Sequence, residues 1–416
     1  MITPVKILGI ETSCDETACG IVQDGKKLLS NEVLSSIDLH KTYGGVVPEI
    51  AARSHIEAII PVIEQSLEQA ACTWDDIDGI AVTYGAGLGG SLLVGVMTAR
   101  TLAIAKEKPL YAINHVEAHI YANFLTSAGT SLATSGPSPA VPKDSLDDAA
   151  LRAPLLSRSS ETTASSAALS RLASSQSPAN ATSKGQSTVN RYQLAKKQPE
   201  FPMLGLIVSG GHTQLVLWHD HFDYSLLGQT RDDAVGEAFD KVAKIIGLPY
   251  PGGPSISKSA ETGDAKAYQL PKARLDSAYD FSFSGLKTAV LRLAQKEIGE
   301  TYDFPSYKVT ERLSEDQRAN IAASFQCVAA ETLVDAAVKA YEEHEPKSVV
   351  IGGGVAANQE LRRQLAERLP LPIEYQDIRL MTDNGAMVAT LGCYHAMFDH
   401  PAADPKTLGI EPNLSM

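Results

Sequence analysis

The chain has 416 residues, of which 44% are hydrophobic and 20% charged, so its composition is that of a globular protein long enough for two or more domains. Its formal net charge of −13 argues against wrapping nucleic acid with the whole surface, although a local basic patch or a partner can still bind it. No apolar run reaches membrane-spanning length, and the five scattered cysteines form no Cys-x-x-Cys pair. These features argue against a membrane-spanning protein, a disulfide framework and a zinc ribbon, and the absence of a leader pattern predicts a cytosolic protein.

The first part of the chain alternates strand and helix patterns. Two period-two apolar runs joined by Asp24-Gly25 predict a β-hairpin, and Pro48 marks the start of a long amphipathic helix. Strands are predicted at residues 5–11, up to 23, from 27, at 79–83 and at 110–114, and a second helix ends near 105. The apolar face of the long helix is expected to consist of Ile56, Ile59, Ile60, Ile63 and Leu67.

The second part repeats this order of elements. Strands are predicted at 203–209, 214–218, 224–229 and 348–351, with a short strand near 373. Helices are predicted from about 232, from 284, after a capping box at 314, around 361–365, and after 382–385. The repeat predicts an α/β fold of two lobes with a central cleft, with ligands outside the carboxyl ends of the strands. The predicted domains are an N-terminal lobe (1–126), a C-terminal lobe (201–384), and a C-terminal helix and tail (385–416).

Residues 127–200 differ in composition from both lobes. Ser, Ala, Thr and Pro dominate, and no aromatic residue occurs between Phe124 and Tyr192. Such a segment buries too little apolar surface to offset its ordering entropy. We therefore predict a disordered insertion that serves as a linker, with a mobile lid as the alternative.

The pair His115 and His119 is the most chemically committed feature. On a helix, residues four apart share one face, so both imidazoles can reach a single metal ion. Glu117 does not follow the first histidine directly, as the base of a His-Glu-x-x-His metalloprotease does, so a protease of that kind is disfavoured. The alternative is two unrelated histidines on an exposed helix.

A third ligand is expected from the other lobe. Asp383 opens the last helix at the place that His115 occupies in the first half, so the repeat puts both at the cleft. Two imidazoles and one carboxylate with open positions suit ferrous iron or zinc. The alternative role for Asp383 is to act as the N-cap of the last helix.

Glycine-dense turns predict a phosphate or nucleotide site in the second half. In the turn at 209–213, missing Cβ atoms let backbone N–H groups approach an oxyanion, and the loops at 251–254 and 352–358 are similar. A tight turn needs glycine for purely conformational reasons, which is the competing interpretation. The rival ligand is a dinucleotide, because Gly85-x-Gly87-x-x-Gly90 and Gly352-x-Gly354-x-x-Ala357 each lie between a strand and a helix.

Taken together, these segments resemble the bacterial branch of the TsaD family of tRNA N6-adenosine threonylcarbamoyltransferases. The resemblance covers nearly the whole chain apart from 127–200. The matching motifs are Glu11-Thr-Ser-Cys-Asp-Glu-Thr17, Tyr43-Gly-Gly-Val-Val-Pro-Glu49, His115-Val-Glu-Ala-His119, Val208-Ser-Gly-Gly-His-Thr-Gln214, Gly236-Glu-Ala-Phe-Asp-Lys241, Tyr250-Pro-Gly-Gly-Pro254, Phe281-Ser-Phe-Ser-Gly-Leu-Lys287 and Thr382-Asp-Asn-Gly-Ala-Met387.

The resemblance implies an actin-like (ASKHA) duplicated fold and a transfer of the threonylcarbamoyl group from threonylcarbamoyl-AMP to N6 of the adenosine 3′ to the anticodon. It implies one divalent metal ion, Fe²⁺ or else Zn²⁺, held by His115, His119 and Asp383. Asp15 and Glu16 are candidates for removing a proton, or else ordinary turn acids. The implied donor-binding residues are Ile207, Val208, Ser209, Gly210, Gly211, Asp240, Gly253 and Asn358.

The resemblance also implies partners. These are tRNA, an inactive TsaB-like paralogue and a small TsaE-like ATPase, with no membrane. Two other functions stay open at this point: a non-catalytic nucleotide-binding paralogue of the same fold, and an ATPase or sugar-kinase-like enzyme. A degenerate paralogue is expected to lack one of the three metal ligands.

Overall fold

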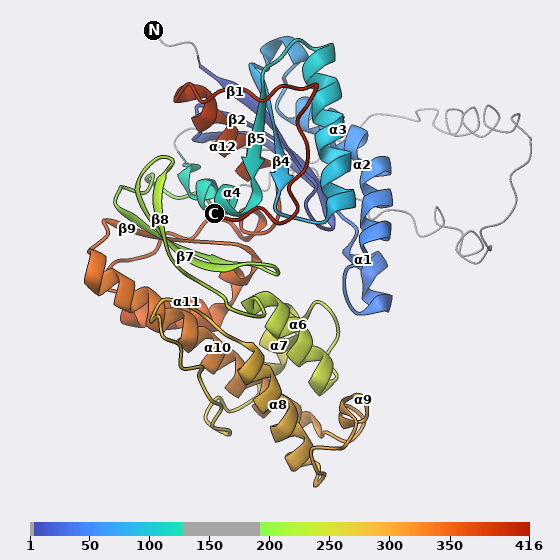
Figure 1. The fold of residues 1–416 in the computed structure, drawn as a ribbon, viewed down its shortest axis with the longest axis vertical. Coiled ribbons are helices and arrows are strands. Elements are labelled where there is room, and N and C mark those ends of the chain that lie inside the picture. Colours follow the sequence, from blue (N-terminus) through green and yellow to red (C-terminus); the bar gives the residue numbers. More distant parts are fainter. Residues whose placement is uncertain (1–3, 128–191) are drawn as a thin grey trace, which may run out of the picture.

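Two lobes, each built on its own β-sheet, make up the structure (Figure 1). It is a computed structural model that describes residues 4–127 and 192–416 of the chain. The strands are β1 (Lys6–Glu11), β2 (Glu16–Gln23), β3 (Lys27–Ser35), β4 (Gly79–Gly85), β5 (Leu110–Asn114), β6 (Met203–Val208), β7 (Thr213–Asp220), β8 (Asp223–Gln229) and β9 (Ser348–Gly352). The helices in and beside the N-terminal lobe are α1 (Ile37–His40), α2 (Pro48–Gln69), α3 (Gly89–Ala105), α4 (His115–Tyr121) and α12 (Gly385–Met397). The C-terminal lobe carries α6 (Val235–Ile246), α7 (Gly252–Ala260), α8 (Ser284–Glu297), α9 (Ser306–Val309), α10 (Glu315–His344) and α11 (Gln359–Arg368).

The two sheets confirm the predicted repeat. In the first, the order is β3-β2-β1-β4-β5, with β1 antiparallel to β2 and parallel to β4. The second has the order β8-β7-β6-β9, with β6 antiparallel to β7 and parallel to β9. Strands β6 to β9 therefore correspond to β1 to β4, which is the expected actin-like duplicated α/β fold.

The short strand expected near Ile373 is wrong, so the second sheet has no counterpart of β5 in the part of the chain that the structure describes. Residues 374–377 instead bond to the segment that returns after residue 191. Ala195 N donates to Gln376 Oε1 at 3.4 Å, and Asp377 N donates to the carbonyl of Gln193 at 2.8 Å. The backbone N–H of Asp377 is thus bonded to the returning segment and not to β9. The predicted disordered insertion falls largely on residues 128–191, which lie outside the described residues.

Helices cover both faces of the first sheet. Helices α2 and α3 pack side by side on one face, while α12 and α4 cover the face toward the C-terminal lobe (Figure 1). The single buried face expected for α2 is only half correct: Ile59 and Ile63 are buried, but Ile56 and Ile60 are 64% and 49% exposed. The stripe that contacts the sheet is therefore narrower than the apolar stripe in the sequence.

Local hydrogen bonds set two of the predicted element boundaries. The capping box at the start of α10 is present, with Ser314 and Gln317 bonding each other's backbone N–H groups. The helix expected from Asp232 begins at Val235, because the Asp232 carboxylate accepts hydrogen bonds from Phe283 N and the Ser282 hydroxyl instead.

Helix α10 is long and apolar enough to cross a membrane, but 61% of its most apolar window is buried inside the lobe, as in a core helix.

The rival dinucleotide site at Gly85–Gly90 is wrong, because the C-terminal segment already occupies that turn. A Cβ on Gly85 would lie 2.1 Å from the carbonyl oxygen of Glu411, and Gly87 N donates to the carbonyl of Pro412 at 3.1 Å. The glycines permit close backbone approach, but the approaching backbone is the chain's own. In the other candidate, a Cβ on Gly352 would lie 2.8 Å from the carbonyl oxygen of His119. A Cβ on Gly353 would lie 2.4 Å from the carbonyl oxygen of Val208.

Candidate functional site

The two histidines lie on the short helix α4, which directly follows strand β5. Asn114 ends the strand and caps the helix, its side chain accepting hydrogen bonds from Val116 N at 2.8 Å and Glu117 N at 3.4 Å. His115 and His119 are both buried. The strand end and the cap thus direct both rings toward the junction between the lobes, as the spacing predicts.

Asp383 reaches the same junction from the loop before α12. The N-cap of α12 is Asn384, whose side chain accepts from Met387 N at 3.0 Å. The alternative role for Asp383 as N-cap is therefore wrong. The capping residue next to it leaves the Asp383 carboxylate available to the histidines.

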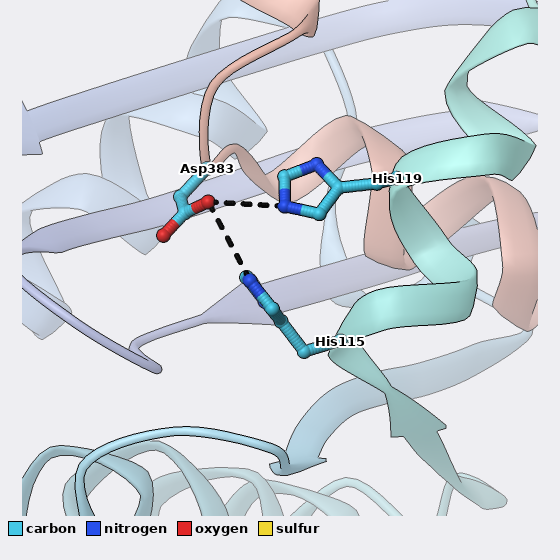
Figure 2. Close-up of side chains that lie close together, drawn as sticks. All are labelled: His115, His119 and Asp383. Carbon is cyan, nitrogen blue, oxygen red and sulfur yellow. Dashed lines mark ion pairs between the residues drawn. The ribbon is translucent and has the colours of Figure 1, made fainter. Parts of the chain in front are cut away.

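The three side chains converge (Figure 2). Their ligand atoms all lie within 4.8 Å of one another, with Asp383 Oδ1 at 3.6 Å from His115 Nε2 and 3.3 Å from His119 Nε2. Two ligands held about 2.1 Å from one tetrahedral ion would lie about 3.4 Å apart. Both ring nitrogens of His119 are buried and make no hydrogen bond with the described residues. A divalent cation fits this set, because the three ligand atoms can share one ion and His119 Nε2, which pairs only with Asp383 Oδ1 among the described residues, would gain a metal bond.

Opposite charges shift the protonation of these groups. Burial by itself would lower the pKa of His115, but the carboxylates of Glu11 and Asp383 raise this pKa to about 9. Burial would likewise raise the pKa of Asp383, whereas the charges of His115 and His119 lower it to about 2. Without a metal, the site is therefore an ion pair at neutral pH.

The hairpin acids Asp15 and Glu16 differ in their surroundings. Asp15 is buried, and its Oδ2 has no hydrogen-bond partner among the described residues. The pKa of Glu16 is raised well above its usual range by burial and by the charges of Asp15 and Asp383. Glu16 is therefore suited to carry a proton at neutral pH, and Asp15 is the better candidate for accepting one.

The structure adds His212, which lies in one of the matching motifs but was not expected at the site. Its ring centroid lies 6.4 Å from that of His115. Burial and the charges of His115 and His119 lower the pKa of His212 to about 4, so it is neutral at pH 7. The sequence signal that could have indicated this residue is its place in the glycine turn of a Ser-Gly-Gly-His-Thr motif.

The predicted donor-binding residues lie around the carboxyl end of β6. Ile207 and Val208 end the strand, and Ser209 to Gly211 form the turn to β7. Added Cβ atoms on Gly210 and Gly211 would meet nothing within 4 Å, so one side of the turn is open.

The other three members of the predicted donor set are at helix ends. Asp240 on α6 accepts a hydrogen bond from Gly252 N at 2.7 Å, next to Gly253 in the first turn of α7. Asn358 caps α11 by accepting from Leu361 N, and its Nδ2 donates to Gln326 Oε1. Asp240 and Gly253 thus adjoin, while the Asn358 side chain already has structural partners.

The proton on His115 gives the site a measurable pH dependence. We expect the apparent affinity for Zn²⁺ to rise about tenfold per pH unit between pH 7 and 9, because the metal must displace the proton from His115, whose pKa is about 9. Competition with a chromophoric chelator of known proton affinity measures this. An affinity that stays constant over this range would contradict the protonation described here.

Comparison with known proteins identifies the family. A model of the TsaD family, described as tRNA N6-adenosine threonylcarbamoyltransferase, matches residues 27–141 and 168–390. The tRNA N6-adenosine threonylcarbamoyltransferase of Thermomicrobium roseum is 43% identical over 397 residues, which cover 94% of this chain and 92% of the relative. That of Dehalococcoides mccartyi is 40% identical over 412 residues, 99% of each chain. The chain therefore belongs to the TsaD family of tRNA N6-adenosine threonylcarbamoyltransferases and is a transferase of this kind.

Proposed function

We propose that this enzyme transfers the threonylcarbamoyl group from threonylcarbamoyl-AMP to N6 of the adenosine 3′ to the anticodon, in tRNAs that read codons beginning with A. The observation that carries the proposal is the convergence of His115, His119 and Asp383 where the two lobes meet. Transfer requires the nucleotide donor and the tRNA acceptor to meet at one site, and the junction between the two lobes is the site that we propose. The cytosolic location predicted from the sequence fits these substrates and stays a prediction.

The donor is proposed to lie along the open side of the turn after β6. Backbone N–H groups of Gly210 and Gly211 would face the phosphate of the adenylate, because no side chain stands in their way. The carboxylate of Asp240 suits the ribose hydroxyls of the AMP half. Asn358, in the loop before α11, would contribute to binding the adenylate while its side chain keeps the capping bond from Leu361 N.

His115, His119 and Asp383 would hold one divalent metal ion. Two imidazoles and a carboxylate with open positions suit Fe²⁺, which we propose, with Zn²⁺ as the alternative. When bound, such an ion would supply Lewis-acid polarisation of the phosphate and carbonyl oxygens of the mixed anhydride.

The remaining chemistry falls to the protein's own acids. A bond forms between adenosine N6 and the carbamoyl carbon, the bond from that carbon to the phosphate oxygen breaks, and AMP leaves. The proton released from N6 would pass to the carboxylate of Asp15, which is buried and lacks a partner on Oδ2. Glu16, held in its neutral form, would keep a second negative charge away from the departing AMP.

The metal role predicts a large loss of transfer in Asp383→Asn. We expect a rate lower by about 100-fold or more, because several kcal/mol of charge stabilisation disappear with the ion. Transfer of radiolabelled threonine from preformed adenylate to unmodified tRNA, with the partner proteins present, measures this. Asp335→Asn, which breaks ion pairs with Lys272 and Arg368 on the surface of α10, is the matched control.

The same assay separates the alternatives. Full transfer by Asp383→Asn would exclude the metal role. ATP hydrolysis by this chain alone, without partner proteins or tRNA, would favour the kinase-like function, and no transfer by the wild-type chain would favour a non-catalytic paralogue.

The two hairpin acids should behave differently when neutralised. Asp15→Asn should slow transfer by about 10²- to 10⁴-fold, because it removes the proposed proton acceptor. Glu16→Gln should stay close to the wild-type rate, because the raised pKa of Glu16 means that the amide imitates the form already present. Single-turnover rates from pH 5 to 8 measure both. Equal losses in the two variants would refute the assignment of the base to Asp15.

We further propose that the chain works with an inactive TsaB-like paralogue and a small TsaE-like ATPase, and that α2 and α3 form the paralogue's docking surface. The supporting observation is a set of exposed apolar side chains on two adjacent helices. A paralogue of the same fold would present the same helix pair, so the contact would be nearly symmetric. The exposed residues are Ile56, Ile60, Leu93, Met97 and Ile104.

Charged substitutions test this surface. The double variant Ile56→Asp, Met97→Asp should lose association with the paralogue by at least about tenfold, because two buried charges without partners disfavour the complex. Size-exclusion chromatography and calorimetric titration measure the complex. A doubly substituted exposed pair on α8, Thr288→Asp and Arg292→Asp, is the control. Unchanged association of the α2–α3 variant would place the partner elsewhere.

A further inference from the structure

Glu11 lies behind the metal-facing histidine, at the carboxyl end of the first strand. Strands β1, β4 and β5 are adjacent and parallel. Their carboxyl ends bring together Glu11 from β1, Thr83 from β4 and His115 directly after β5. Residues about a hundred positions apart thus form one row across the sheet edge that faces the site.

The Glu11 carboxylate is fully buried, and hydrogen bonds hold both of its oxygens. Oε1 accepts from Ser13 N at 2.6 Å, and Oε2 accepts from the Thr83 hydroxyl. Oε2 also lies 3.2 Å from His115 Nδ1. A carboxylate with these donors is a fixed acceptor, because its neighbours leave it no other orientation.

The contact selects one tautomer of His115. A carboxylate accepts only, so Nδ1 must carry the proton and donate, and the lone pair of the neutral ring is then on Nε2. Nε2 is the atom that faces Asp383, at 3.6 Å. The side chain behind the ring therefore presents the correct nitrogen to a cation.

We propose that Glu11 is a positioning residue for the metal, which fixes the orientation and tautomer of His115 through its Nδ1–H and raises the basicity of its Nε2. Carboxylates that accept from the far nitrogen of a ligating imidazole typically contribute 10- to 100-fold in metal affinity. The inference rests on the metal part of the proposed function.

His119 has no comparable support. Its Nδ1 is buried and makes no hydrogen bond with the described residues. Orientation of the histidine pair by hydrogen bonding therefore comes from the His115 side. Ser13 Oγ also lies 3.2 Å from His115 Nδ1, so among the described residues the serine hydroxyl is the competing partner that the experiment must separate.

Metal titration of the full-length chain tests the proposal without depending on transfer activity. The dissociation constant for Zn²⁺ is measured against a chromophoric chelator at pH 7.5 for the wild type, Glu11→Gln, Glu11→Ala and Ser13→Ala. Glu32→Gln is the matched control, because Glu32 is also buried in the first sheet but accepts a hydrogen bond from Gln69 Nε2 at the end of α2. Thermal unfolding of each metal-free variant accompanies the titration.

We expect Glu11→Ala to bind Zn²⁺ about 10- to 100-fold more weakly and Glu11→Gln to fall between it and the wild type, since the amide oxygen can still accept from Nδ1–H. Glu32→Gln and Ser13→Ala should bind like the wild type. If Glu11→Ala does not fold, Glu11→Gln decides.

Three outcomes would overturn the proposal. Unchanged affinity in a folded Glu11→Gln, with lowered thermal stability alone, would make Glu11 a purely structural acceptor for Ser13 N and Thr83. A loss confined to Ser13→Ala would assign the orientation to the serine. No Zn²⁺ binding by the wild type would refute the metal proposal itself, and the Glu11 inference with it.

Discussion

The contact between α12 and strands β1 and β2 is the constraint on which the candidate site depends. A Cβ on Gly9 would lie 2.3 Å from Ala389 N, and one on Gly20 would lie 2.5 Å from Ala386 N. Helix and sheet therefore touch backbone to backbone, and only glycine allows this distance. Because α12 cannot shift along the sheet, Asp383, two residues before it, has a defined position relative to His115.

This contact also explains why the site lies between lobes that are far apart in sequence. Helix α12 follows the C-terminal lobe in the chain but packs on the sheet of the N-terminal lobe (Figure 1). Residues of β6 and β7 share a hydrophobic cluster with α4 and α12. The three converging side chains thus come from the layer between the two sheets, where packing from both sides limits their movement.

Carboxylates outnumber positive charges in this layer. Glu11 and Asp383 lie beside His115, and the charges of Asp15 and Asp383 act on Glu16. Burial makes an isolated charge costly here. The cost of burial is met in two ways. Glu11 and Asp383 are ionised beside His115, whereas Glu16 holds a proton. A divalent cation in place of the His115 proton would neutralise the two ionised carboxylates of Glu11 and Asp383, which is why such a cation suits this donor set.

The sequence by itself determined the local structure. Period-two runs, the Asp24-Gly25 turn and the Ser314 capping box depend on neighbours in the chain, and all are present in the structure. The spacing of His115 and His119 likewise needs only a helix. The motif order was sufficient to indicate the family, because so many specific segments occur together.

Only the tertiary structure decided which distant groups meet. The role of Glu11 depends on strands β1, β4 and β5 being neighbours, and no local pattern encodes that order. Asn384, not Asp383, is the N-cap because the helical backbone of α12 begins at Gly385, and the Asp383 carboxylate lies beside His119 on α4. Ile56 is exposed although its helical spacing matches that of Ile59, since the area that a sheet offers to a helix is set by packing geometry and not by the helix's own sequence.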